Sequence, residues 1–291
     1  MARIAKEIFT VRGTENVARE IRKIVSDMYP GRAFMDIPAL VADVAAIFAG
    51  TFPGYRHCTT GYHDLSHALD VTLAAARLLH GMKISGMSVS RRGAECVLFA
   101  ALFHDIGFIQ EAWDTEGTGA RYATTHVQRG IVFAERYLAA RDIGVDAGQC
   151  ARIIRFTDLT PEHQPETGDQ ETDLLGKTLA SADLMAQMAD RGYLPKLPLL
   201  YAEFVEGGVG GFADEYDMVQ KTPGFAGFVR ARLRGPLGNL SPLVRHHFRV
   251  RWQVDQDLYA MYLERNMADL LGILRKWGPE YRSALQETDM M

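Results

Sequence analysis

Histidine and aspartate side chains occur at three places beside strongly apolar runs of the sequence. The first place holds His67, the second the consecutive pair His104 and Asp105, and the third Asp183. A buried carboxylate without a partner costs on the order of several kcal/mol, so an ion or a cation must lie beside it. Imidazole and carboxylate together suit divalent ions such as Zn, Mn, Fe, Co, Ni or Mg. The sequence therefore predicts a metal site, where a bound water would become a usable hydroxide near neutral pH.

The spacing of these residues indicates how helices would position them. His63 and His67 are four residues apart, and on a helix this spacing puts both side chains on one face. His104 and Asp105 are neighbours, which diverge by about 100° on a helix. Both can therefore reach one ion only near a helix end, or with the ion between them. Gly107 follows them closely and fits such an end.

Apolar residues recur at helical spacing along almost the whole chain, and convincing alternating strand patterns are lacking. The expected helices cover about 15–28, 38–48, 67–79, 90–103, 123–140, 147–156, 174–188, 195–205 and 255–277, with Thr14 and Asp36 as N-caps of the first two. The sequence thus predicts an all-α, bundle-like fold. We expect a single domain over residues 1–291, with N-terminal helices in 1–49, a core in about 50–206 and a C-terminal helical extension in 207–291.

Composition and charge argue against several classes of function. Of the 291 residues, 47% are hydrophobic and 23% charged, and the net charge is −4, which does not favour a nucleic-acid polymer as partner. The longest apolar run, 96–103, is far short of a membrane span, and the N-terminus lacks the apolar core of a signal peptide. Cys58, Cys96 and Cys150 form no close pair in the sequence, so reduced thiols are expected. We expect a cytoplasmic protein with no membrane partner. A homodimer is compatible with the sequence.

Several phrases of the sequence occur in an order that a known family shares. Residues 62–71 read Tyr-His-Asp-Leu-Ser-His-Ala-Leu-Asp-Val, residues 156–163 read Phe-Thr-Asp-Leu-Thr-Pro-Glu-His and residues 180–184 read Ala-Ser-Ala-Asp-Leu. With the His-Asp pair between them, they resemble the HD-domain superfamily of metal-dependent phosphohydrolases, and more narrowly class I cyclic nucleotide phosphodiesterases. The resemblance covers roughly residues 55–190. It implies a phosphodiesterase-like helical bundle and phosphoester hydrolysis.

The resemblance also implies a role for each matched residue. His67, His104, Asp105 and Asp183 would hold the first metal ion, and Asp105 would bridge to a second ion if there is one. His63 would be the general acid that protonates the leaving oxygen.

Further candidates follow from the same resemblance. Thr157 and Asp158 would line the metal-water side. His126 is similar to a histidine of the HD-GYP branch that helps to hold the second metal, and His163 is another candidate. The chain departs from the phosphodiesterase phrase His-Asp-Ile-Asp-His by reading His-Asp-Ile-Gly-Phe at residues 104–108. The resemblance therefore implies fold and reaction type better than substrate.

The expected function is hydrolysis of a phosphoester of a small nucleotide-like molecule, with His63 and Asp105 as catalytic residues and one or two divalent ions as cofactor. Two alternatives stay open. One is an HD-type di-iron oxygenase, which would need His126 and His163 as extra ligands. The other is a non-catalytic, ligand-binding HD module. Cations near the motifs could meet phosphate oxygens, although a solvated helix face is their commoner role: Arg121, Arg129, Arg155 and Lys177. The adjacent His246 and His247 are expected at the surface.

Overall fold

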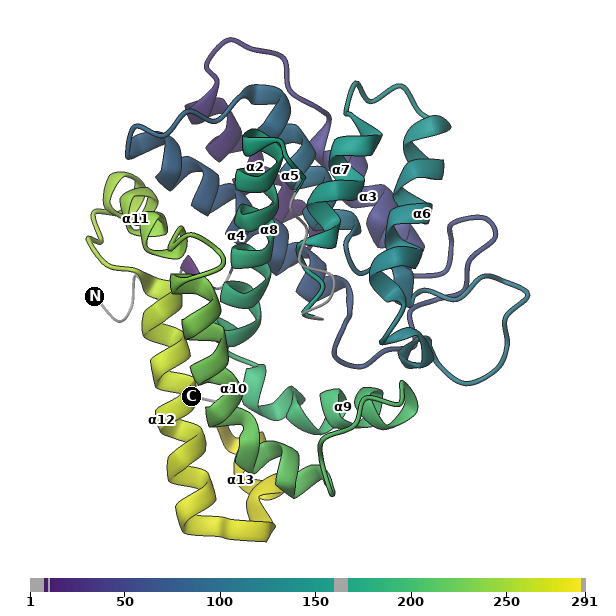
Figure 1. The fold of residues 1–291 in the computed structure, drawn as a ribbon, viewed down its shortest axis with the longest axis vertical. Helices are drawn as coiled ribbons and strands as arrows, with labels where there is room; N and C mark the ends of the chain where they lie inside the picture. The colour runs from purple at the N-terminus through teal and green to yellow at the C-terminus, as the bar shows by residue number, and fades with distance from the viewer. Residues whose placement is uncertain (1–7, 10, 160–166, 289–291) are drawn as a thin grey trace.

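The computed structural model describes residues 8–9, 11–159 and 167–288, and helices make up most of these ranges (Figure 1). The α-helices are α2 (Thr14–Met28), α3 (Ile37–Phe48), α4 (Leu65–Ile84), α5 (Arg91–Phe103), α6 (His126–Ala139), α7 (Ala147–Arg155), α8 (Gln170–Ala189), α9 (Tyr193–Glu206), α10 (Glu215–Arg234), α11 (Val244–Trp252), α12 (Leu258–Trp277) and α13 (Tyr281–Thr288). The described part of the chain contains no strand, only an isolated antiparallel bridge between Tyr55 and Glu111. The expected all-α fold is confirmed.

Polar side chains define where the central helices begin. The Asp64 carboxylate accepts a hydrogen bond from the His67 backbone N–H (2.9 Å) at the start of α4. Ser90 caps α5 in the same way, because its hydroxyl accepts from the Gly93 N–H (2.9 Å). Asp169 caps α8. These caps fix the first residues of the three helices that line the candidate metal site.

Most expected helix starts differ from the observed ones by one to four residues, and two of these differences change an expected cap or the setting of a site residue. Thr14 is the first residue of α2 rather than its cap, and Gly13 occupies the cap position with φ 81°. The helix expected from His67 begins at Leu65 and continues to Ile84. Because Asp64 is its cap, His63 lies in the preceding loop and not on the helix face that it was expected to share with His67.

Helix α4 lies at the centre of the bundle and packs against α8, α5, α11 and α2. Every residue of α5 from Gly93 to Phe103 is buried. The C-terminal helices are not separate from this core, because α11 packs on α4 and α12 packs on α8. Buried apolar side chains from the N-terminal, central and C-terminal helices form one continuous cluster. The site helices are therefore braced from several sides.

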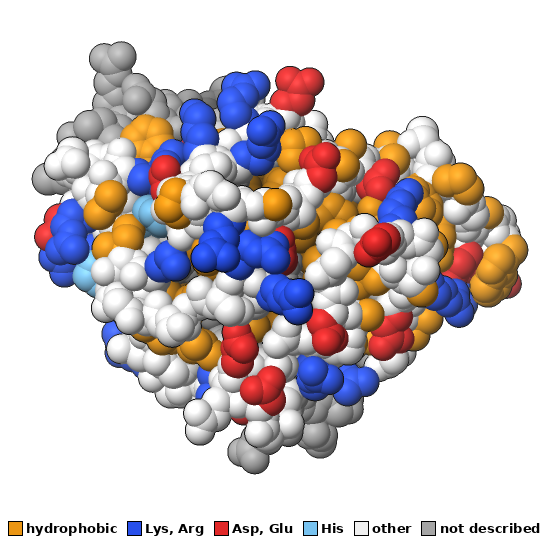
Figure 2. Space-filling model, turned by 90° about the horizontal axis from the view of Figure 1, so that it is seen from above, with side chains coloured by type: hydrophobic (Ala, Val, Ile, Leu, Met, Phe, Trp, Pro, Cys, Tyr) orange, Lys and Arg blue, Asp and Glu red, His pale blue; other side chains and the backbone are white. Residues whose placement is uncertain are grey.

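Helices α9, α10, α12 and α13 form the lower part of the molecule in Figure 1. Helix α9 contacts α10, α12 and α13, and it also contacts the 3-10 turn η2 (Gly119–Tyr122). It thus links the C-terminal helices to the loop that leads into α6. None of the helices in the described ranges is long and apolar enough to cross a membrane. Figure 2 shows acidic, basic and apolar side chains intermixed on the face that it draws.

The C-terminal histidine pair differs from expectation. His246 is half-buried and His247 is completely buried. The Nδ1 atom of His247 lies 3.0 Å from the Nδ1 atom of His80 on α4. This contact joins α11 to the core, so the expected surface position is wrong for His247. The three cysteines are free thiols, as expected.

Candidate metal centre

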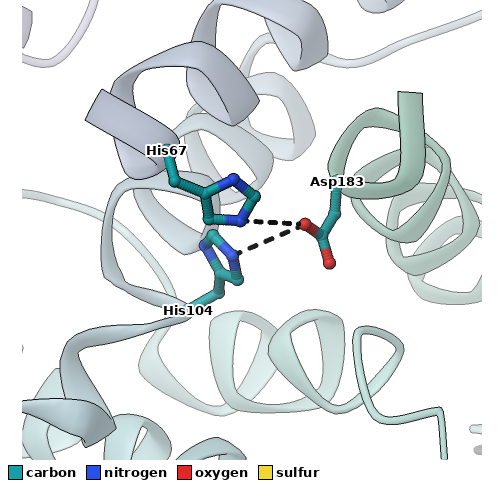
Figure 3. A group of neighbouring side chains, drawn as sticks. All are labelled: His67, His104 and Asp183. Carbon is teal, nitrogen blue, oxygen red and sulfur yellow. Dashed lines mark ion pairs between the residues drawn. The ribbon is translucent and has the colours of Figure 1, made fainter. Parts of the chain in front are cut away.

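Three helices bring their polar side chains to one point inside the bundle. His67 lies in the first turn of α4, His104 is the C-cap residue directly after α5, and Asp183 lies within α8. Figure 3 shows both imidazole rings and the Asp183 carboxylate directed toward one another. One ligand atom from each of these three residues lies within 4.8 Å of the other two. The structure thus brings together residues that are 116 positions apart in the sequence.

Distances between these groups are those of a compact polar centre. Asp183 Oδ1 lies 3.3 Å from His67 Nε2 and 3.8 Å from His104 Nε2. Asp105 follows the end of α5 and turns toward the same point, with Oδ2 3.4 Å from His67 Nε2 and 3.2 Å from His104 Nε2. All four expected ligands therefore meet.

The buried edge of this centre has unsatisfied polar atoms. His104 Nδ1 lies 2.8 Å from the Ala101 carbonyl oxygen, so Nδ1–H donates and Nε2 faces the centre. His104 Nε2 and Asp105 Oδ2 are buried and lie 3.2 Å from each other, and neither atom has another hydrogen-bond partner among the described residues. Leaving such groups unpaired costs about 1–3 kcal/mol each or more. A divalent ion is the ligand that would satisfy an imidazole nitrogen and carboxylate oxygens together, and the residues present fit one.

Electrostatics inside the centre show how strongly its charges interact. Burial opposes a charge on His104, but the Asp105 carboxylate outweighs it and raises the pKa of His104 to about 9. Burial likewise opposes the charge on Asp105, yet the neighbouring imidazoles, His104 first, hold its pKa well below the usual value. The carboxylate thus stays ionised and needs a positive partner, which is either a proton on His104 or a metal ion.

His126 lies on the other side of Asp105. Its Nε2 atom is 3.8 Å from Asp105 Oδ1, while its Nδ1 atom is 2.7 Å from the Ala123 carbonyl oxygen. This orientation repeats that of His104, with Nδ1–H donated to a backbone carbonyl and Nε2 facing the carboxylate. Burial lowers the pKa of His126, which keeps Nε2 available as a ligand atom. The two Asp105 oxygens therefore face different histidines.

His63 is held by a residue that the sequence did not reveal. Its Nδ1 atom lies 2.5 Å from Glu203 Oε2 on α9. Glu203 Oε1 accepts hydrogen bonds from the backbone N–H groups of Tyr62 (2.6 Å) and His63 (3.3 Å). Burial lowers the pKa of His63, but the bond to Glu203 and the charges of the Glu203, Asp105 and Asp183 carboxylates together outweigh burial, and the net shift is upward. Glu203 follows Leu197 and Leu200 at helical spacing on a buried face, and a charged residue in that stripe is the signal that could have identified it.

Phe108 packs between two of these histidines. Its ring lies parallel to the His63 ring, with centroids 4.5 Å apart, and parallel to the His126 ring at 4.3 Å. Phe108 belongs to the 3-10 turn η1 (Ile106–Phe108) that follows Asp105. Asp105 and the short turn directly after it therefore supply the central carboxylate and an apolar wall for two imidazoles.

The remaining candidates have contacts of their own. The Thr157 hydroxyl donates to the Ile154 carbonyl (2.8 Å), and the Asp158 carbonyl accepts from Arg232 Nη2 on α10 (3.3 Å). These contacts place both residues at the end of α7 and assign neither of them a role toward an ion. His163 lies outside the described residues.

Two of the four cations proposed for phosphate binding are engaged elsewhere. Arg121 bonds to Asp114, and Arg129 bonds to Glu111 and to two backbone carbonyls. Arg155 is exposed on α7. Lys177 lines a separate surface cleft beside Asp173.

Comparison with known proteins adds one partial match. Residues 111–230 match the model of a family described as Npun_R2479-like, to which this part of the chain is similar. The match includes His126, Asp183 and Glu203 and leaves out the segments that carry His67 and His104. Neither a curated protein nor a solved structure matches the chain.

Proposed function

We propose that this chain is a metal-dependent phosphohydrolase of the HD-domain type. The observation that carries the proposal is the buried convergence of His67, His104, Asp105 and Asp183, in which His104 Nε2 and Asp105 Oδ2 have no hydrogen-bond partner other than each other among the described residues. Two imidazoles and two carboxylates form a donor set suited to Mn, Fe, Zn, Co, Ni or Mg. The ordered sequence phrases around these residues support the reaction class.

A divalent ion bound by these four residues would supply Lewis-acid polarisation of a phosphoryl oxygen and a water of lowered pKa. The protein itself supplies the proton for the leaving group. Glu203 orients His63 through Nδ1 and favours its protonated form, which leaves Nε2 to deliver a proton to the departing oxygen. Phe108 packs flat on the same ring and restricts its rotation.

The substrate that we propose is a small phosphoester, nucleotide-like in class. Its phosphate charge would be met by the bound ion and by His63, because Arg121 and Arg129 are committed to carboxylates and carbonyls. A cytoplasmic location is part of the proposal and is supported by the three free cysteines.

An HD-type di-iron oxygenase is the second candidate function. The observation that favours it is His126, whose Nε2 atom faces Asp105 Oδ1 at 3.8 Å and would serve as a ligand to a second iron. Iron analysis and EPR separate the two candidates. A di-iron oxygenase would contain two irons per chain and give the EPR signal of a mixed-valent iron pair. A phosphohydrolase is expected to work with redox-inert ions.

Two substrates with different leaving groups test the proposed function. The Mn-loaded protein is assayed with bis-p-nitrophenyl phosphate, whose leaving group needs little protonation, and with a panel of nucleotide phosphoesters that release an alkoxide. We expect His63→Ala to lower turnover of the alkoxide substrates by about 100-fold, the usual scale of general acid catalysis, and to lower the p-nitrophenyl reaction far less. His57→Ala, an exposed histidine, serves as the control.

Three outcomes would count against the proposal. If the protein is shown to be metal-loaded and hydrolyses none of these compounds with any ion, the phosphohydrolase assignment is wrong. If His63→Ala slows both substrates equally, His63 is not the proton donor. If Asp105→Asn loses the metal but keeps full turnover, the ion is structural.

A further inference from the structure

A single arginine joins the turn after Asp105 to the helix that carries His126. Arg129 lies on α6, one turn after His126. Its Nε atom donates to the Gly107 carbonyl (2.8 Å), and its Nη2 atom donates to the Ile109 carbonyl (3.1 Å). The guanidinium thus binds the middle residue of the short turn that follows Asp105 and the residue directly after that turn.

Two further contacts hold the guanidinium of Arg129 in place. Its Nη2 atom also lies 2.9 Å from a Glu111 carboxylate oxygen. Its central carbon lies 3.6 Å from the ring centroid of Tyr122, which is cation–π packing against an aromatic face. Only a planar group with several donors can make these contacts together, because a lysine ammonium lacks the fork and the flat face.

No side chain separates the turn from α6 where they cross. A Cβ added to Gly107 would lie 1.9 Å from the His126 carbonyl oxygen. A Cβ added to Gly130 would lie 2.9 Å from the His104 carbonyl oxygen. Backbones this close have no interlocking side chains to fix how one slides along the other. Hydrogen bonds such as those of Arg129 must therefore fix the position of the turn along α6.

The position fixed in this way determines the geometry around Asp105. Asp105 lies at the start of the turn and His126 in the first turn of α6, so their separation of 3.8 Å depends on how the two segments are joined. The edge formed by His67, His104 and Asp183 rests on α4, α5 and α8 instead. The His126 side of Asp105 therefore depends more directly on the contact between the turn and α6 than the other side does.

We infer that Arg129 is a positioning residue that holds Asp105 Oδ1 and His126 Nε2 together as the second ion position of the centre. This inference rests on the proposed metal-dependent function. The inference goes beyond that function because it makes the geometry of the second ion position, and not of the first, depend on Arg129. Arg129 itself would contact neither an ion nor the substrate.

Titration of the metal-free protein with Mn²⁺ tests the inference. Calorimetry gives the number and affinity of the ions, and EPR reports an exchange-coupled Mn pair independently of activity. The wild-type protein is expected to bind two ions. Arg129→Met should keep the first ion at close to wild-type affinity and bind the second at least about 10-fold more weakly, with loss of the coupled signal, as for supporting residues of other metal ligands. Arg129→Lys should also weaken binding of the second ion. Arg152→Met, which removes an exposed arginine of α7, should change the affinity for neither ion.

Each other result has a defined meaning. If the wild type binds one ion, the second position is wrong while the proposed function stands. If it binds none, the proposed function fails as well. Unchanged binding of both ions in Arg129→Met, or equal loss of both, overturns the positioning role. If Arg129→Met does not fold by circular dichroism, the same titration of Arg129→Lys decides, and unchanged affinity for the second ion overturns the inference.

Discussion

Replacing Gly107 by alanine probes the crossing between the Asp105 turn and α6. The new Cβ would lie 1.9 Å from the carbonyl oxygen of His126 and 2.8 Å from the backbone nitrogen of Gly130. These neighbours are backbone atoms and cannot rotate away. The two segments must therefore separate by about 1 Å or more to restore van der Waals contact. The change adds one methyl group and no charge, so its effect isolates the steric term.

The expected magnitude follows from this overlap. Overpacking a well-packed interior typically costs about 1–3 kcal/mol, and the rigid backbone neighbours place Gly107→Ala at about 3 kcal/mol of unfolding free energy. Gly272→Ala is the matched control. Its Cβ within α12 would meet no atom within 4 Å, so its better helix propensity should stabilise the protein by up to about 1 kcal/mol.

Urea unfolding of the metal-free protein, followed by circular dichroism, measures both variants at constant m-value. A separate Mn²⁺ titration of Gly107→Ala should show weaker binding on the His126 side of Asp105. The reasoning is refuted if Gly107→Ala is as stable as Gly272→Ala. It is also refuted if Gly107→Ala unfolds with wild-type stability while retaining both ions.

Three further predictions concern single polar residues. Glu203→Gln should lower the pKa of His63. Because the proton donor must be protonated, turnover of alkoxide substrates should then begin to fall at a lower pH than in the wild type. An unchanged pH–rate profile would contradict the role of Glu203 in holding the proton on His63. Burial raises the pKa of Asp70 from 3.8 to about 6, so the wild type should lose stability as the pH rises through about 6. Asp70→Asn should remove this pH-dependent loss. Linkage limits the loss to about 3 kcal/mol, and the partial exposure of the carboxyl makes it smaller. Burial and Arg77 hold the pKa of His247 well below 6.5, so stability should fall below pH 6.5 by about 1.4 kcal/mol per pH unit, and urea midpoints that stay level between pH 7 and 5.5 would count against it.

Much of the helical framework could be predicted because it depends on local patterns. The apolar run that ends at Phe103 predicts α5 and its burial, and Asp36 predicts the start of α3. The meeting of His104 and Asp183 was predicted from an apolar setting that makes isolated charges costly. The approach of their ligand atoms to within 4.8 Å of one another depends on tertiary packing and is seen only in the structure.

Other features could not be predicted because the deciding partner is remote in the sequence. His63 and Glu203 are 140 residues apart, and only the packing of α9 brings them together. His247 lies among arginines that suggest a surface helix, but one face of α11 turns inward to meet His80. The four-residue spacing suggests a helix face shared by His63 and His67, but Asp64 is the N-cap of α4, so the helix begins at Leu65 and His63 lies in the loop before it.

The central claim is that His67, His104, Asp105 and Asp183 form a metal centre, and metal binding by the purified, metal-free protein tests it most directly. Calorimetric titration with Mn²⁺ should show saturable binding in the wild type. Asp183→Asn keeps the size of the side chain but removes a carboxylate oxygen that lies 3.3 Å from His67 Nε2, and it should weaken binding of the first ion at least about 100-fold. Failure of the wild type to bind any divalent ion, or wild-type affinity in Asp183→Asn, would contradict the claim.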